Sequence, residues 1–309
     1  MSAAASGNFP WSVVPEPPAG RTRFDWLRLD AAAERPTSRC LAARGRFPGP
    51  AVLVAAALDQ IGSPAHAAAL RLAEALDAAR LRGSLLVLMP DGAPLSRVIP
   101  FPGTPDGDDR RRLAHALALE IIAPADVVIE LRGADAAERN DGVAVHYLGG
   151  REHSERRAAD VARALGLPFS LGTRAPGSPT TIAAQAARLD RTAVLAQLPD
   201  DSQTHPSAEE LFGGLVNGLR AAGALEGPAT TSDCAALMLA GVVIVPVAGQ
   251  WEPALRIGQR LRVHDELGVL RDTSGGELGR MRATEAGIVV SYRMADAVKT
   301  GDALAVIGR

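Results

Sequence analysis

Apolar residues occur along this chain in short continuous runs that alternate with segments of helical spacing. The run from Ala51 to Leu58 is the clearest, and Pro50 and Asp59 bound it. A continuous apolar run of this length is typical of a strand buried on both faces of a parallel sheet. Similar runs predict other strands at 24–29, 40–44, 84–89, 126–131, 142–147, 168–171 and 192–198.

Helical periodicity fills most of the intervals between these strands. Apolar positions about four residues apart predict helices at 64–80, 108–121, 152–165, 179–189 and 207–223. Pro64 suits a first helical residue, Ser207 and Glu210 have capping-box spacing, and Gly223 is a helix stop. Alternating strands and helices predict an α/β domain with helices on both faces of a mostly parallel, mixed sheet.

The pattern changes near residue 233, where short β runs separated by Gly turns replace the helical spacing. The segments 240–263 and 286–307 also resemble each other. Two such halves predict a small barrel or sandwich like the lipoyl carrier domains. The tip of its hairpin, 293–296, reads Arg-Met-Ala-Asp and lacks a carrier lysine, and Lys299 lies in the later turn. We therefore expect a mobile arm at 1–20, an α/β domain at 21–228 and a non-carrier β-domain at 229–309.

Composition restricts the possible partners and the location. The formal net charge is −2, which gives no indication of a nucleic-acid or membrane-surface partner. No apolar run is long enough for a membrane span, and the N-terminal residues lack the features of a secretory signal. Cys40 and Cys234 fit no metal or redox spacing, so we expect two thiols in a reducing cytoplasm.

Two loops are the expected places for a site. Residues 59–63 follow the central strand, and ligand sites in open α/β sheets lie outside the carboxyl ends of strands. Residues 90–107 form a long loop rich in Pro and Gly, and loops of that length are often functional.

Several segments, in order, resemble the succinylglutamate desuccinylase/aspartoacylase family of zinc-dependent amide hydrolases. The resemblance covers roughly residues 45 to 309. It is carried by PAVLVAAALDQIG (50–62), FPGTPDG (101–107), IAPADVVIELRG (122–133), SAEELFGGLVNGLRAAGAL (207–225) and EAGIVVSYRMADAVKTGDALAVIG (285–308). It implies a zinc-carboxypeptidase-like α/β/α sandwich followed by a small C-terminal β-domain.

The resemblance also implies where a zinc site would lie, and the matching positions hold other residue types. The His-x-x-Glu zinc pair falls on Asp59 and Gly62, and the third ligand, a His, falls on Arg132. Arginine stays protonated and offers no lone pair to a metal. The catalytic Glu falls on Gln197, which cannot take a proton from a zinc-bound water. The substrate-gripping Asn-Arg pair falls on Val98 and Ile99.

These replacements lead to two functional hypotheses. The first is a metal-free, non-catalytic homologue without a cofactor, which acts as a partner or regulatory subunit or binds a small acyl-amino-acid-like ligand. It would be a homo-oligomer or pair with an intact paralog, with Asp59 and Arg132 facing each other. The alternative is a zinc-dependent amide hydrolase with a rebuilt or shared site. His146, Glu152 and His153 suggest a further metal site, although a polar strand end and a helix N-terminus explain them more simply.

Overall fold

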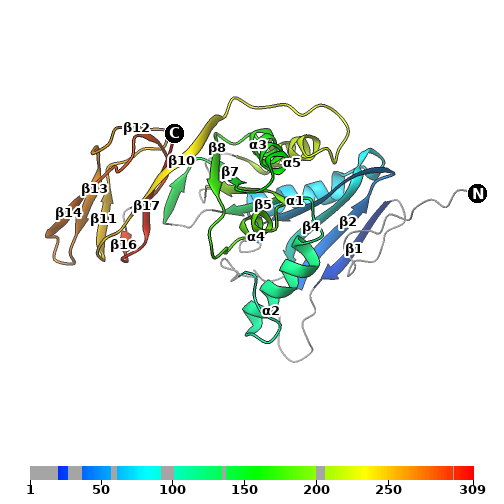
Figure 1. The fold of residues 1–309 in the computed structure, drawn as a ribbon, viewed down its shortest axis with the longest axis horizontal. Coiled ribbons are helices and arrows are strands. Elements are labelled where there is room, and N and C mark those ends of the chain that lie inside the picture. The colour runs from blue at the N-terminus through cyan, green and yellow to red at the C-terminus, as the bar shows by residue number, and fades with distance from the viewer. Residues whose placement is uncertain are drawn as a thin grey trace, which may run out of the picture.

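The computed structural model describes residues 20–26, 37–56, 61–91, 101–133, 137–199, 206–294 and 296–309. A 13-stranded sheet runs through the molecule, and a second sheet of four strands packs at its C-terminal end (Figure 1). The strands of the large sheet are β1 (Gly20–Trp26), β2 (Thr37–Arg44), β3 (Phe47–Ala56), β4 (Arg82–Asp91), β5 (Val127–Gly133), β6 (Glu138–Asn140), β7 (Val143–Leu148), β8 (Phe169–Arg174), β9 (Thr192–Leu198), β10 (Ala235–Ile244), β12 (Arg260–Leu261), β15 (Gly287–Arg293) and β17 (Ala303–Gly308).

Strand order in the large sheet is β1-β2-β4-β3-β5-β9-β7-β8-β10-β17-β15-β12, with β6 paired to β15. The neighbours β4, β3, β5 and β9 are mutually parallel, and β7, β8 and β10 are parallel to one another. Pairing between β9 and β7 is antiparallel. The predicted mixed, mostly parallel α/β sheet is therefore confirmed in the first part of the chain.

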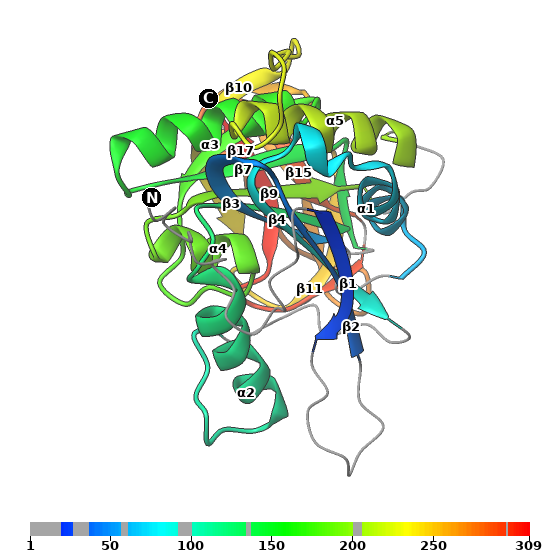
Figure 2. The same cartoon turned by 90° about the vertical axis from the view of Figure 1, so that its right-hand side faces the viewer.

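Helices cover both faces of this sheet, as predicted. Helices α1, α3 and α5 lie on one face, and α2, η2 and α4 lie on the other (Figure 2). Their bounds are α1 (Pro64–Ala75), the 3-10 turn η1 (Ala78–Arg80), α2 (Asp109–Ala116), the π-helical turn η2 (Leu117–Ile122), α3 (Glu152–Ala164), α4 (Ile182–Arg188) and α5 (Ala208–Ala221). The capping box of α5 is present, because Ser207 Oγ accepts from Glu210 N and the Glu210 carboxylate accepts from Ser207 N.

Two helices differ from the sequence prediction at their C-terminal ends. The helix expected at 64–80 ends at Ala75, because Leu76 is extended and Asp77 caps a separate 3-10 turn. The helix expected at 108–121 changes to π-helical geometry at Leu117. The helical spacing of apolar residues continues through Leu76 and Leu117. The apolar pattern alone therefore does not show where the backbone conformation changes. Residues 1–19, predicted as part of a mobile arm, lie outside the described residues.

The C-terminal part consists of β-strands, as the change in pattern predicted. Its four-stranded antiparallel sheet has the order β14-β13-β11-β16, with β11 (Gly249–Pro253), β13 (Glu266–Arg271), β14 (Glu277–Arg282) and β16 (Asp296–Val298). Trp251 is fully buried between this sheet and the end of the large one, and its Nε1 donates to the Arg293 carbonyl at 3.0 Å. Strand β10 pairs with β8 over 235–238 and with β17 from Leu239 onward, so it joins the two parts.

Gly214 allows α5 to pack closely against the end of α3. A Cβ added at Gly214 would lie 2.3 Å from the Leu165 carbonyl oxygen, whereas one at neighbouring Gly213 would meet nothing within 4 Å. We expect Gly214→Ala to lower the free energy of unfolding by about 1–3 kcal/mol through overpacking. Gly213→Ala, the matched control, should raise it by roughly 0.5–1 kcal/mol because alanine favours helix. Denaturant unfolding measures both, and equal effects would contradict the packing argument.

Candidate functional site

The candidate site lies where β5 and β9 end side by side. The two strands are parallel, and their register pairs Arg132 with Gln197. Residues paired in this way project from the same face of a sheet, and carboxyl ends of parallel strands share one edge. The two positions that the family resemblance assigned to a zinc ligand and to the catalytic base are thus neighbours, although a cation and an amide occupy them.

Gln197 is held by a carboxylate from a distant segment. Its Nε2 donates to Oε2 of Glu138 at 2.7 Å, and both side chains are partly buried. Glu138 begins β6, whose backbone pairs with β15 of the C-terminal part, Glu138 opposite Arg293. The hydrogen bond therefore connects the edge of the α/β sheet to a strand that is anchored on the C-terminal strands.

A second carboxylate lies further from the sheet edge, on the same face of β5. Glu130 is 7% exposed, and its Oε2 accepts from the backbone N–H of Ala183 at 2.8 Å. That N–H belongs to the first turn of α4, which Thr181 caps. A carboxylate at a helix N-terminus is favourable because the free N–H groups and the helix dipole both attract negative charge. Glu130 thus fixes α4 against the sheet beneath the candidate site.

Tyr147 shows how strongly this region is desolvated. Burial, and then the nearby Glu130 carboxylate, raise the pKa of Tyr147 to about 12, while a hydrogen bond with Thr181 and the charge of Arg132 act in the opposite direction. The phenol therefore stays neutral at physiological pH and can act only as a hydrogen-bonding group. The charges of Glu130 and Arg132 thus both act on the Tyr147 phenol, so the three side chains lie near one another at this end of the sheet.

Some predicted site residues have a described position and others do not. Gly62 lies before α1 with φ +80°, and its N–H donates to His66 Nδ1 at 3.0 Å. Asp59, Val98 and Ile99 lie outside the described residues. The expected facing of Asp59 and Arg132 therefore stays a prediction. Glu138 was missed by sequence reasoning, because only the pairing of β6 with a strand about 150 residues later brings it to the site.

The described residues of the site do not fit a zinc ion. Arg132 contributes a permanent cation, Gly62 has no side chain, and the Gln197 amide donates to Glu138. Within the described ranges, no group of three or more His, Cys, Asp or Glu side chains is placed to hold a metal. A catalytic zinc needs three protein ligands and an open position, and it is the group that makes hydroxide available in such enzymes.

The further metal site suggested by His146, Glu152 and His153 is not assembled. His146 is buried on β7 beside Ser170 Oγ at 3.4 Å, and burial lowers its pKa, so the ring is kept neutral. Glu152 pairs with Arg156, and His153 contacts Arg157 at 2.7 Å. Each of the three side chains thus has a different neighbour, in agreement with the simpler explanation.

Comparison with known proteins gives matches in structure only. No protein-family model matches the sequence, and no curated protein matches it. A product-bound structure of the ectoine utilization protein EutE (DoeB) from Ruegeria pomeroyi is similar with a TM-score of 0.76 at 21% identity, over 97% of this chain and 99% of that one. A succinylglutamatedesuccinylase/aspartoacylase from Rhodobacter sphaeroides has a TM-score of 0.74 at 19% identity, over 94% and 96%.

An aspartoacylase family protein from Mesorhizobium loti is similar with a TM-score of 0.73 at 19% identity, over 94% of this chain and 95% of that chain. Among the described residues, no helix is both long enough and apolar enough to cross a membrane. Similarity over nearly the whole length of all three structures extends to the C-terminal strands as well as the α/β sheet. The chain therefore has the zinc-carboxypeptidase-like fold of the succinylglutamate desuccinylase/aspartoacylase structures, as its sequence resemblance implied.

Proposed function

We propose that this chain is a metal-free, non-hydrolytic relative of the desuccinylase/aspartoacylase enzymes that works by binding. The observation that carries the proposal is the pairing of Arg132 with Gln197 at the sheet edge, with the Gln197 amide engaged by Glu138. This arrangement has a fixed cation in place of a metal ligand and an amide in place of a base. At residues 132 and 197 it has neither the metal ligand nor the base that metal-dependent amide hydrolysis requires.

The binding role has two forms. In one, a small acyl-amino-acid-like ligand enters the former active-site region, and the Arg132 guanidinium attracts its carboxylate, since guanidinium and carboxylate match in geometry. In the other, the chain is a partner or regulatory subunit, either as a homo-oligomer or with an intact paralog. Both forms have the same support. The chain has the fold of the hydrolase structures, but the positions matched to the zinc ligands and the base hold other residue types, and function resides in the site rather than in the fold.

One observation favours the alternative, a zinc-dependent deacylase with a rebuilt site. Glu138 brings a carboxylate to within 2.7 Å of the Gln197 amide, so the region keeps an acidic group although residue 197 is not acidic. In an enzyme of this kind, Glu138 would be the proton acceptor and part of the metal set would come from residues outside the described ranges or from another chain.

Metal analysis and an amidase assay distinguish the two functions. Protein produced with added zinc should contain no stoichiometric zinc and should hydrolyse neither N-acetyl- nor N-succinyl-amino acids, with an active aspartoacylase as the assay control. Stoichiometric zinc with turnover that Glu138→Gln abolishes would overturn the binding proposal and establish the rebuilt enzyme. Light scattering and a pull-down from the source organism test the partner form, which a strictly monomeric, unaccompanied chain would contradict.

A further inference from the structure

A groove of about 750 Å³ lies in the C-terminal part of the molecule, formed by strand ends other than those of the candidate site. Its charged lining comprises Arg260, Arg262, Arg309 and Asp265, and its aliphatic lining includes Leu237, Leu261 and Ile288. A volume of this size falls within the range of about 300–1,000 Å³ typical of small-molecule sites. The groove is therefore large enough for a metabolite with both charged and apolar portions.

Backbone pairing sets the relative positions of Arg260 and Arg309, and Arg262 follows β12 directly. On β12, Arg260 pairs with Ile288 of β15, and Ile288 pairs with Gly308 of β17. Arg309 follows directly and exchanges backbone hydrogen bonds of 2.7 and 2.8 Å with Met238 of β10. Four strands thus meet at this rim. Sites built on such regular elements hold their side chains more precisely than loops do.

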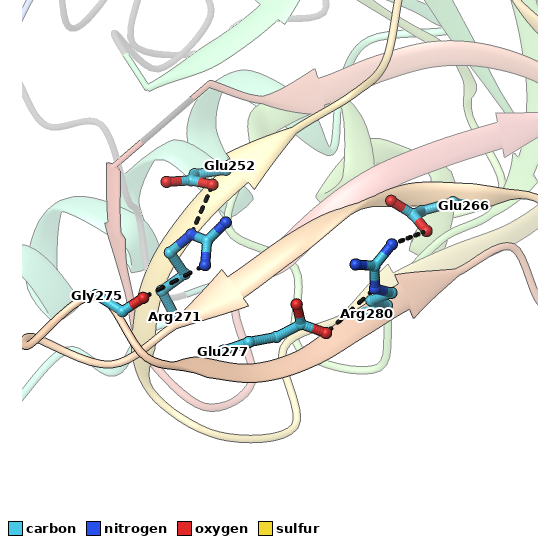
Figure 3. A network of polar contacts seen from close by, with 6 residues as sticks. All are labelled: Glu252, Glu266, Arg271, Gly275, Glu277 and Arg280. Carbon is cyan, nitrogen blue, oxygen red and sulfur yellow. Dashed lines mark hydrogen bonds and ion pairs between the residues drawn. The ribbon is translucent and has the colours of Figure 1, made fainter.

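The arginines of the groove differ from others in the same part of the chain. On the four-stranded sheet, Arg271 pairs with Glu252, and Arg280 pairs with Glu266 and Glu277 (Figure 3). Within the described ranges, Arg260, Arg262 and Arg309 form no ion pair. The Asp265 carboxylate in the groove accepts from the backbone N–H of Arg262 at 2.7 Å. The side chains that line the groove thus include three guanidinium groups and one carboxylate, which gives the lining a net positive charge.

The floor of the groove is apolar. Leu237 and Leu261 are 8% and 4% exposed, and Ile288 is partly buried. An inorganic anion would contact only the arginines and leave this floor to water. A ligand with an apolar body gains from covering the floor, at roughly 25 cal/mol per Å² of apolar surface removed from water.

We propose that this groove binds an organic anion of metabolite size, with a carboxylate or phosphate on the arginines and an apolar body on the aliphatic floor. Arginine suits either group, because its planar fork of donors matches carboxylate and phosphate oxygens. The groove is open to solvent, so we expect dissociation constants in the micromolar to millimolar range, with a clear dependence on salt concentration. This site is separate from the candidate site at the ends of β5 and β9.

Calorimetric titration of the full chain tests the proposal with four probes: octyl phosphate, octanoate, inorganic phosphate and the neutral octyl glucoside, each below its micelle-forming concentration. We expect both octyl anions to bind more tightly than the other two. The double variant Arg260→Gln/Arg262→Gln should weaken their binding about tenfold or more, as expected when charge-assisted hydrogen bonds are lost. Arg271→Gln, a matched control on the same domain, should leave binding unchanged. Melting temperatures verify that each variant is folded.

Three results would overturn the proposal. One is the absence of binding by either octyl anion, or equal binding by inorganic phosphate, which would leave an adventitious ion only. Another is equal weakening by Arg271→Gln, which would indicate a general effect of surface charge. The third is loss of binding with Arg132→Gln rather than with the double variant, which would place the ligand in the candidate site.

Discussion

Amide hydrolysis should appear in this chain only after five substitutions are combined, of which three should be enough for zinc binding. Asp59→His, Gly62→Glu and Arg132→His place the family's three ligands at the positions that the resemblance assigns to them. Gln197→Glu supplies the general base, and Glu138→Gln supplies an amide to hold it, since Glu138 now accepts from Gln197 at 2.7 Å. Because ligands and base act as a unit, we expect any smaller set to give at most residual turnover.

Two intermediate variants make this expectation specific. The three ligand substitutions alone should bind zinc with only residual hydrolysis, because residue 197 is still an amide and the Glu138 carboxylate is engaged by that amide. Adding the exchange at residues 138 and 197 should then raise turnover by about 10²- to 10⁴-fold over the triple variant. At residue 62 a Cβ would meet nothing within 4 Å, so there is space for the new Glu side chain. The φ of +80° there favours glycine, so this substitution should cost some backbone strain.

Zinc content by mass spectrometry and hydrolysis of N-acetyl- and N-succinyl-amino acids measure these steps. The Michaelis constant should stay high, because Val98 and Ile99 offer no charge to a substrate carboxylate. Activity in the triple variant, with Gln197 unchanged, would show that another group is the base. Zinc bound by the unsubstituted chain would show that its ligands lie elsewhere.

Much of the fold could be predicted from local patterns. Residues 51–56 of the predicted central strand belong to β3, which forms parallel pairs with β4 and β5 on its two sides, and residues 57–58 lie outside the described ranges. The capping box at Ser207 marks the start of α5. These features could be predicted because each depends on residues that are close together in the sequence. Strand β6 was missed because three residues carry too little pattern, and their partner β15 lies far along the chain.

The candidate site was predictable only in part, for the same physical reason. The resemblance placed Arg132 and Gln197 at one site, and the register of β5 and β9 brings them together. Their partners depend on tertiary structure: Glu138 arrives through the pairing of β6 with β15, and Glu130 acts on the N-terminus of α4. The resemblance identifies Gln197 only as the residue at the position of the catalytic base. It does not show that the Gln197 amide donates a hydrogen bond to the Glu138 carboxylate.

That hydrogen bond leads to the second prediction, that Gln197→Glu alone destabilises the protein in a pH-dependent way. The substitution replaces a donor by an acceptor and places two carboxyl groups at hydrogen-bond distance. Two carboxylates that close cannot both stay ionised at low cost, so the pKa of one of them rises. Keeping a carboxyl group with an ordinary pKa of about 4.3 protonated at pH 7 costs at most about 4 kcal/mol. Partial exposure and the neighbouring Arg132 reduce this, and we expect a loss of about 1–3 kcal/mol.

The sign of the pH dependence follows from the raised pKa in the folded state. Below about pH 4.3 the carboxyl group is protonated in both the folded and the unfolded states, so the variant should approach the stability of the unsubstituted chain. As the pH rises from about 4.3 toward the higher folded-state pKa, the unfolded chain releases this proton while the folded state keeps it, so the difference in stability grows until the folded-state pKa is passed. Denaturant unfolding of both proteins between about pH 5 and pH 8 measures this divergence.

The exchange variant Gln197→Glu/Glu138→Gln is the matched control for this prediction. It reverses the direction of the hydrogen bond but keeps one amide and one carboxylate, so most of the lost stability should return at neutral pH and the additional pH dependence should disappear. Recovery of this kind requires that the two side chains interact directly, because independent effects of the two substitutions would add. If the exchange variant is no more stable than Gln197→Glu, the contact between residues 138 and 197 does not link β9 to β6. If Gln197→Glu matches the unsubstituted chain at every pH, Arg132 neutralises both carboxylates and the predicted cost is absent.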